Sequence, residues 1–235
     1  MNDPILITGC ARSGTSMVAG AIERCGAFGG VLAGATKNNR AGMFENTRIR
    51  NTIVKPYLRK LGMDPLGQYP LPDVASLSIP NNLNTLVTGI MKEQGYRNGP
   101  WFYKGAKLCL IWPIWTYAFP NAKWIIVRRQ TADIVQSCLK TNFMRAFGKE
   151  VFRESAGVKD EVEGWVWWVE QHKKRFVEMM EAGLNVKVVW PDKMVRGDYS
   201  QLYETVEWLG LKWDSDALIK FVDPKLWHSR RKENG

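Results

Sequence analysis

The sequence feature that most constrains the fold is a short apolar run followed by a loop framed by glycines. Residues 5–7 are three consecutive aliphatic residues, and such a run is typical of a parallel strand that is buried on both faces. After Gly14, apolar residues recur at helical spacing until Gly26, where a helix would end. The chain therefore opens with a strand, a loop and a helix.

This loop has the features of an anion-binding site. A helix N-terminus presents unpaired N–H groups and the positive end of the helix dipole, so a phosphate group is a natural ligand there. Gly9 and Gly14 allow a close approach of the backbone. Their spacing is that of a P-loop, but Thr15 stands where the P-loop has its Lys, and the cation Arg12 comes three residues earlier. A site without that Lys is poorly suited to a nucleoside triphosphate with Mg²⁺.

Residues 12–16, Arg-Ser-Gly-Thr-Ser, resemble the 5′-phosphosulfate loop of the sulfotransferases that use 3′-phosphoadenosine 5′-phosphosulfate (PAPS). The resemblance implies a P-loop-like α/β fold. It also implies that the loop binds the phosphosulfate group of the donor and that its cation takes part in catalysis. The predicted donor-binding residues of the loop are Arg12, Ser13, Gly14, Thr15 and Ser16. Because the donor also carries a 3′-phosphate, a second anion site is expected further along the chain.

The second site is predicted where the apolar run 124–127 ends. Arg129 and Ser137 stand eight positions apart, as in the 3′-phosphate motif of the same family, although Gln130 replaces the usual Pro. A guanidinium at a strand end offers a forked pair of donors, and a helix hydroxyl adds another bond to the same phosphate. Arg128 is the alternative contact.

Three further segments resemble the bacterial and viral branch of the family, namely residues 42–46, 119–124 and 221–226. The resemblance spans nearly the whole chain and is weakest over residues 62–100. It implies transfer of a sulfuryl group from PAPS to a hydroxyl or amine, with adenosine 3′,5′-bisphosphate (PAP) as product and without a metal. The acceptor is expected to be a small molecule or a glycan, and segment 62–100 is a candidate acceptor-facing or lid insertion.

The general base is the least determined part of the prediction. Of the two histidines, His172 lies at an inward helical position and His228 lies near the C-terminus. Glu45 lies in the motif 42–46 and is the candidate base, although an acid there can equally serve as a helix N-terminal charge or cap. Lys104, at the end of a short predicted strand, is the second catalytic candidate, and an ordinary strand-end cation is the alternative.

Composition favours one α/β domain spanning residues 1–235, with a net charge of +10. The basic residues are scattered and form no nucleic-acid motif, so a small anionic cosubstrate explains the charge better than DNA or RNA. The four cysteines form no C-x-x-C pair, which favours a reduced, cytoplasmic protein. The sequence contains no apolar run of about 18 residues, so a membrane-spanning segment is not expected. The oligomeric state stays open.

The remaining pattern alternates strands with helices, which predicts a parallel sheet covered on both faces, with ligand at the carboxyl ends of its strands. Strands are expected over residues 101–104, 124–127 and 186–190, and helices over 47–61 with a kink at Pro56, 83–91, 108–118, 131–140, 160–180 and 198–209. The helix over 198–209 is expected to be capped by Asp198.

Two other classes of function compete with the sulfotransferase prediction. A P-loop kinase-like enzyme would use ATP with Mg²⁺, and Asp192 is then the only candidate for a strand-borne metal ligand. A noncatalytic module that binds anions or nucleic acid would explain the charge alone. The basic tail, residues 230–232, is either a solvated segment or a clamp on the 3′-phosphate.

Overall fold

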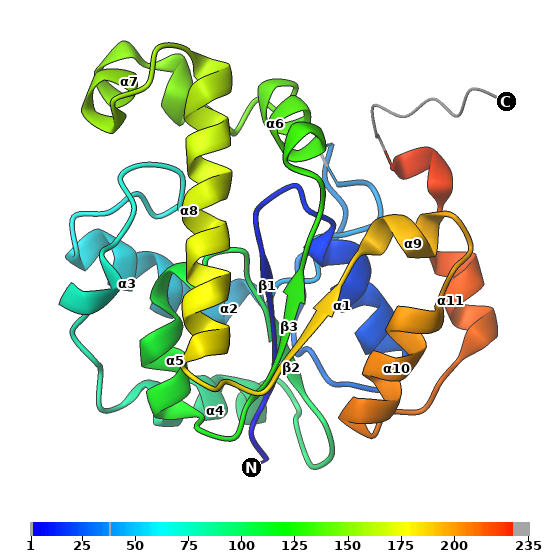
Figure 1. Cartoon of the computed structure of the whole chain (residues 1–235). Coiled ribbons are helices and arrows are strands. Elements are labelled where there is room, and N and C mark those ends of the chain that lie inside the picture. Colours follow the sequence, from blue (N-terminus) through cyan, green and yellow to red (C-terminus); the bar gives the residue numbers. More distant parts are fainter. Residues whose placement is uncertain (1, 38, 228–235) are drawn as a thin grey trace, which may run out of the picture.

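The computed structural model describes residues 2–37 and 39–227, and its centre is a four-stranded parallel sheet (Figure 1). The strand order is β2-β1-β3-β4. Leu6 of the first strand is in register with Tyr103 on one side and with Trp124 on the other. The strands are β1 (Ile5–Gly9), β2 (Phe102–Lys104), β3 (Lys123–Val127) and β4 (Val186–Val189). The predicted parallel α/β fold of a single domain is confirmed.

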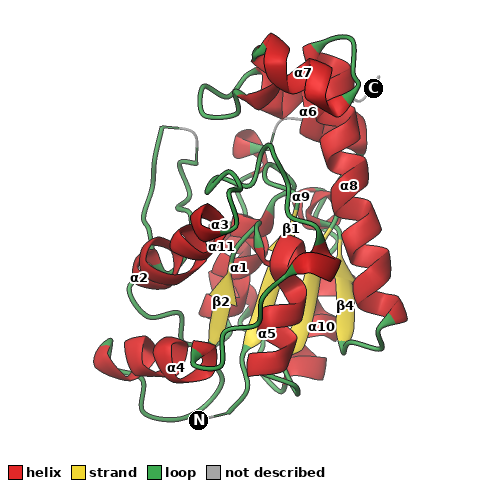
Figure 2. Ribbon diagram, turned by 90° about the vertical axis from the view of Figure 1, so that its left-hand side faces the viewer, coloured by secondary structure: helices red, strands yellow, loops and turns green. Residues whose placement is uncertain are grey.

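Helices cover both faces of the sheet, which is why the strands are almost entirely apolar. Alternate residues of β1 and β3 enter two separate cores, because successive side chains of a strand point to opposite faces. One core lies under α4 (Leu83–Glu93), α5 (Trp112–Ala118) and α8 (Glu161–Glu181). The other lies under α1 (Thr15–Arg24), α10 (Ser200–Leu209) and α11 (Ser215–Phe221). Figures 1 and 2 show the two layers.

The helix expected over residues 47–61 is a composite. It consists of α2 (Thr47–Ile49), a π-helical turn (Arg50–Val54) and α3 (Lys55–Lys60). Pro56 lies in the first turn of α3. Because proline has no N–H to donate to the preceding turn, the helix changes its bonding pattern just before this residue, where the sequence predicted a kink.

The other predicted helices are present, although residues 108–111 form a 3₁₀ turn before α5. The Asp198 prediction is wrong, since α10 begins at Ser200, and Asp198 Oδ1 instead accepts a hydrogen bond from the Ser200 N–H in the preceding turn (3.0 Å). The sequence analysis missed three short helices, which contain too few turns for apolar periodicity to show. The missed helices are α7 (Glu150–Ala156), α9 (Pro191–Val195) and α11, whereas α6 (Thr131–Leu139) was predicted.

Segment 62–80 follows an irregular path with one 3₁₀ turn at Val74–Ser76. It is nevertheless tied to its surroundings. The buried Gln68 accepts hydrogen bonds from the backbone of Arg145 (2.8 Å) and Ala146 (3.1 Å). Trp168 Nε1 donates to the carbonyl of Gly67 (2.9 Å). Side-chain and backbone bonds therefore hold this segment against α8 and the 143–147 loop.

Several residues that could have served other roles belong to the core. His172 is buried and its Nδ1 bonds the Trp168 carbonyl (2.8 Å), while burial lowers its pKa to about 4. Trp115, Trp165 and Trp168 are fully buried. All four cysteines are buried and unpaired. In the part of the chain that the structure describes, no helix is both long and apolar enough to cross a membrane.

Candidate active site

The loop after β1 is built on backbone conformations that few residues adopt. Gly14, the N-cap of α1, has φ +94°, in the left-handed region that favours glycine. A Cβ at Gly9 would stand 2.5 Å from the carbonyl oxygen of Val127, so only glycine allows β1 and β3 to approach this closely. Arg12 has φ +72° although it carries a side chain. A positive φ at a non-glycine residue costs about 1–3 kcal/mol and is concentrated at functional sites.

Three of the residues predicted to bind the donor meet at this loop. Arg12 Nε donates to Ser137 Oγ (2.8 Å), although the residues are 125 positions apart. Arg129 Nη1 donates to the carbonyl of Arg12 (3.0 Å). The two arginines follow β1 and β3, which are neighbours in the parallel sheet, so the carboxyl ends of both strands bring them to the same edge.

Burial and mutual repulsion act on these two cations. Desolvation lowers the pKa of Arg12 and of Arg129 from the ordinary value, and the charge of Arg12 lowers that of Arg129 further. Asp133 opposes this effect on Arg129, with its carboxylate 4.0 Å from Nε. Two guanidiniums brought together in a partly dehydrated site are stabilised by an anion, because an anion restores the favourable charge balance that burial removes.

A cavity of about 510 Å³ opens at this edge of the sheet. Six cations line it, namely Arg12, Lys37, Arg40, Arg129, Lys140 and Lys225. Among the described lining residues, Asp223 is the single acid. Gly14, Thr15, Ser16 and Ser137 also line the cavity, whereas Ser13 is fully buried beneath the loop. The cavity therefore combines a helix N-terminus with a strong excess of positive charge.

Arg128 lies away from this cavity. Its guanidinium is 5.6 Å from the ring centre of Phe176 and 5.5 Å from that of Trp190. The side chains of adjacent residues at a strand end point in opposite directions. The structure therefore brings Arg129 to the loop and directs Arg128 to the aromatic residues beside α8 and β4.

The C-terminal part of the described chain forms one wall of the cavity. The ring of Trp227 lies 4.1 Å from the Arg129 guanidinium carbon, and a Cβ at Gly14 would come within 2.8 Å of the same ring. Trp227 therefore covers both the loop and the cation. His228 and the basic tail 230–232 lie outside the described residues.

Segment 42–46 connects the cavity to the two other catalytic candidates. Phe44 has φ +50° and packs edge-on against Phe221 (5.5 Å between ring centres). This turn exposes the carbonyl of Met43 to two donors, Ser16 Oγ (3.1 Å) and Lys104 Nζ (3.0 Å). Burial lowers the pKa of Lys104 to about 8. Lys104 therefore shares an acceptor, the Met43 carbonyl, with Ser16 of the anion-binding loop.

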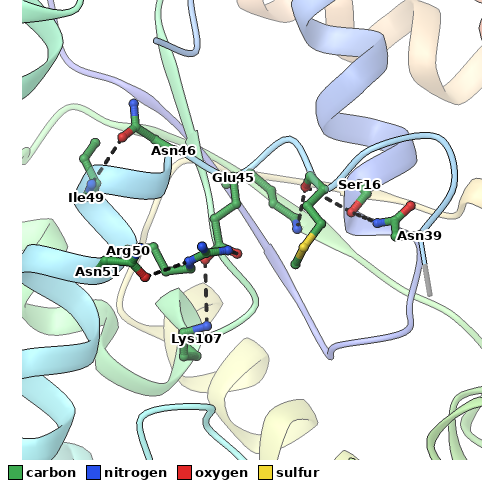
Figure 3. Close-up of polar contacts among 10 residues, drawn as sticks. Ser16, Asn39, Glu45, Asn46, Ile49, Arg50, Asn51 and Lys107 are labelled. Carbon is green, nitrogen blue, oxygen red and sulfur yellow. Dashed lines mark hydrogen bonds and ion pairs between the residues drawn. The ribbon is translucent and has the colours of Figure 1, made fainter. Parts of the chain in front are cut away.

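Glu45 lies on the other side of this segment, and it is not among the described residues that line the cavity (Figure 3). Its carboxylate is 3.7 Å from Arg50 Nη1 and 3.7 Å from Lys107 Nζ. Its Oε1 is buried and makes no hydrogen bond within the described part of the chain. Asn46, not Glu45, is the N-cap of α2, because Asn46 Oδ1 accepts a hydrogen bond from the Ile49 N–H (3.2 Å).

Most of the cavity wall was not predicted as part of the site. The lining residues that were not predicted include Lys37, Asn39, Arg40, Lys140, Thr141, Lys225 and Trp227. Two of them had a usable signal, since Lys140 and Thr141 follow Ser137 by three and four positions and so share its face of α6 or the turn that follows. Lys37 and Arg40 had none, because a polar loop without periodicity does not reveal which side chains turn inward.

Asp192 is the residue that a kinase-like enzyme would need as a metal ligand. Asp192 Oδ2 accepts a hydrogen bond from Arg196 Nη2 (2.9 Å), and Asp192 is not among the described residues around the cavity. Within residues 2–37 and 39–227, no three His, Cys, Asp or Glu side chains gather in a way that could hold a metal ion.

Solved structures show which known fold the chain shares. The sulfotransferase domain from the curacin biosynthetic pathway matches with a TM-score of 0.56 at 14% identity, over 95% of this chain and 78% of that one. The sulfotransferase domain from the Synechococcus PCC 7002 olefin synthase matches with a TM-score of 0.55 at 13% identity, over 94% and 78% of the two chains.

A sulfotransferase from Mycobacterium avium matches with a TM-score of 0.52 at 12% identity, over 94% of this chain and 67% of that one. No family model and no curated protein matches the sequence. The identities are low and the coverage is high, so the likeness concerns the path of the chain. The chain has the fold of the sulfotransferases, a central parallel sheet with helices on both faces.

Proposed function

We propose that this protein transfers a sulfuryl group from PAPS to a hydroxyl or amine of a small-molecule or glycan acceptor. The observation that carries the proposal is the meeting of Arg12, Arg129 and Ser137 at one cavity. These residues belong to two motifs far apart in the sequence, which were assigned to the two anionic ends of one nucleotide. The shared fold supports the same conclusion.

The residues present fit such a nucleotide. A volume of about 510 Å³ lies within the range of about 300–1,000 Å³ that is usual for small-ligand pockets. The excess of lining cations suits a ligand with several negative charges. The positive φ of Gly14 and the N-terminus of α1 suit a phosphate group at the loop.

We assign the loop residues 12–16 to binding of the 5′-phosphosulfate, and Arg129 and Ser137 to binding of the 3′-phosphate. PAPS supplies a sulfuryl group whose transfer to an acceptor hydroxyl releases PAP and one proton. Lys104 would stabilise the negative charge of the transferring group, and Glu45 Oε1 would accept the proton, since this atom lacks a hydrogen-bond donor among the described residues. The four free cysteines favour a reducing compartment such as the cytoplasm.

Ligand-induced stabilisation tests this function directly. PAP should raise the midpoint of thermal unfolding, because a ligand that binds only the folded state stabilises it by about 2.7 kcal/mol at a hundred times its Kd. ATP with Mg²⁺ and short oligonucleotides serve as comparisons and are expected to have little effect. A shift with ATP–Mg²⁺ alone would favour the kinase-like alternative, and a shift with oligonucleotides alone would favour a nucleic-acid-binding module.

Replacing Arg129 by Ala should weaken PAP binding by about 1.5–3 kcal/mol, the contribution of a hydrogen bond to a charged group. Arg129 lines the cavity and also donates to the Arg12 carbonyl. Arg128→Ala is the matched control, since its side chain lies over Phe176 and Trp190. Isothermal titration with PAP compares the two variants. Equal losses in both, or a loss in Arg128→Ala alone, would contradict the assignment.

A further inference from the structure

A second cluster of charge surrounds Glu45, which is not among the described residues that line the cavity. Figure 3 shows Glu45 with Arg50 and Lys107. One carboxylate, Glu45, faces the ammonium of Lys107 and the guanidinium of Arg50, each 3.7 Å away. Lys104 adds a third cation and is 5% exposed. The side chains of Lys107 and Arg50 are 11% and 18% exposed. Positive charge therefore exceeds negative charge in a region with little water.

Glu45 gives the cations of this cluster no hydrogen bond. Arg50 Nε donates to Asn51 Oδ1 instead (3.1 Å), and Lys104 Nζ donates to the Met43 carbonyl (3.0 Å). Hydrogen bonds between N–H donors and oxygen have lengths of about 2.7–3.2 Å, so both 3.7 Å separations are ion pairs without a hydrogen bond. Collecting several like charges in a poorly hydrated region is unfavourable unless further negative charge is supplied.

The cationic region continues toward the surface along the helix 47–60. The π-helical turn Arg50–Val54 precedes Lys55. In an α-helix, residues five apart differ by about 140° in direction, and a π-helical turn, which bonds residues five apart, reduces this difference. Arg50 and Lys107 both lower the pKa of Lys55, and so does the exposed Arg59, after the larger effect of burial. Single π-helical turns are frequent at functional sites.

Two polar atoms without partners border the same small space. Tyr103 Oη and Glu45 Oε1 are buried and make no hydrogen bond in the described part of the structure. A Cβ added at Gly105 would be 3.5 Å from the first and 3.6 Å from the second, which is ordinary contact distance. Gly105 therefore leaves space for one methyl-sized group between these two atoms and Leu108 Cγ, which would be 3.4 Å away. A hydroxyl fits, because it can donate to Glu45 and bond Tyr103 at once.

Segment 62–80 covers this cluster. A Cβ at Gly67 would come within 2.8 Å of Lys107 Cγ, so the backbone of the segment rests directly on the Lys107 side chain. This contact places the segment over the cation cluster.

Resting on the proposed function, we propose that the acceptor carries a carboxylate or phosphate group in addition to its reacting hydroxyl. The anionic group would pair with Lys107, Arg50 and Lys55, and the hydroxyl would lie against Glu45 and Tyr103. The site thus selects anionic acceptors over neutral ones of the same shape.

Matched probes test this selectivity by isothermal titration with PAP-saturated protein. The probes are para-hydroxybenzoate, para-hydroxyphenyl phosphate and the neutral para-hydroxybenzamide. At least one anionic probe should bind about ten- to a hundredfold more tightly than the amide, the ratio expected for a hydrogen bond to a charged group. The stronger of the two anions identifies the carboxylate or the phosphate as the preferred group.

Lys107→Gln should abolish this preference. Lys55→Gln, at a half-buried position, should reduce the preference for anionic probes. It provides a second test in case Lys107→Gln does not fold. Lys60→Gln is the matched control on the same helix, at an exposed position, and should bind all probes like wild type. Equal or absent binding of all three probes, or a preference that persists in both test variants, would overturn the inference. Failure of PAP to bind would instead contradict the proposed function, and the probe preference can then be measured without PAP.

Discussion

Glu45→Gln is expected to lower kcat by about 10²- to 10⁴-fold, the usual contribution of a general base, while PAP binds with unchanged affinity. The reason is geometric. Glu45 Oε1 makes no hydrogen bond in the described chain, so its lone pairs are available to a substrate proton, and glutamine removes the proton-accepting charge without changing the shape. Labelled PAPS and an acceptor give the rate, and isothermal titration gives the affinity.

The same substitution also has a structural cost, which must be separated from catalysis. It removes the partner of Arg50 and Lys107, and breaking a buried ion pair costs up to about 3–5 kcal/mol. Thermal unfolding therefore accompanies the assay. Glu45→Asp keeps the charge but withdraws the carboxylate, so it should lose turnover with less loss of stability. Glu93→Gln, which removes an exposed partner of Arg48, is the control. Full activity in Glu45→Gln would show that another group accepts the proton.

Lys104→Met is expected to lower kcat by about 10²- to 10³-fold, as does removal of one donor that stabilises charge in a transition state. The ammonium is buried and shares the Met43 carbonyl with Ser16 of the anion-binding loop. PAP should still bind, because PAP lacks the transferring group. Lys123→Met is the control, since Lys123 also donates to a carbonyl (2.6 Å) but at the opposite end of the sheet. A proportional loss of PAP affinity would contradict this role.

The pH dependence gives an independent test of Lys104. Burial lowers its pKa to about 8, with Glu45 opposing this effect and Lys107 adding to it. Only the protonated form can stabilise negative charge, so kcat/KM of the wild type should fall as the pH rises through about 8. Lys104→Arg should remain active above this pH because a guanidinium stays charged. An unchanged pH profile in that variant would exclude Lys104 as the titrating group.

The titration of Lys104 should also make the stability of the protein depend on pH. The pKa of Lys104 is about 8 in the folded protein and 10.5 ordinarily. Between these values the unfolded chain binds more protons than the folded one, so wild-type stability should rise with pH over this window. Below about pH 8 the folded protein bears the full cost of a buried charge. Lys104→Met is therefore not expected to lower the thermal midpoint at pH 7.

The sequence by itself determined the sheet and the position of the anion-binding loop. Aliphatic runs can be buried on both faces only in a covered parallel sheet, and Gly9 and Gly14 occupy positions where a side chain would clash or be strained. Because parallel strands end at a common edge, the cations after β1 and β3 were expected at the same edge of the sheet. These are local or topological constraints, so residue order suffices to predict them.

Only the tertiary structure decided which side chains share a site. Arg128 and Arg129 are chemically identical neighbours, and packing against Phe176, Trp190 and Trp227 distinguishes them. The cations around Glu45 come from positions 50 and 107, and the cavity wall includes Phe221, Asp223 and residues 225–227. Such groupings depend on how distant segments pack, and a separation along the chain carries no information about that distance.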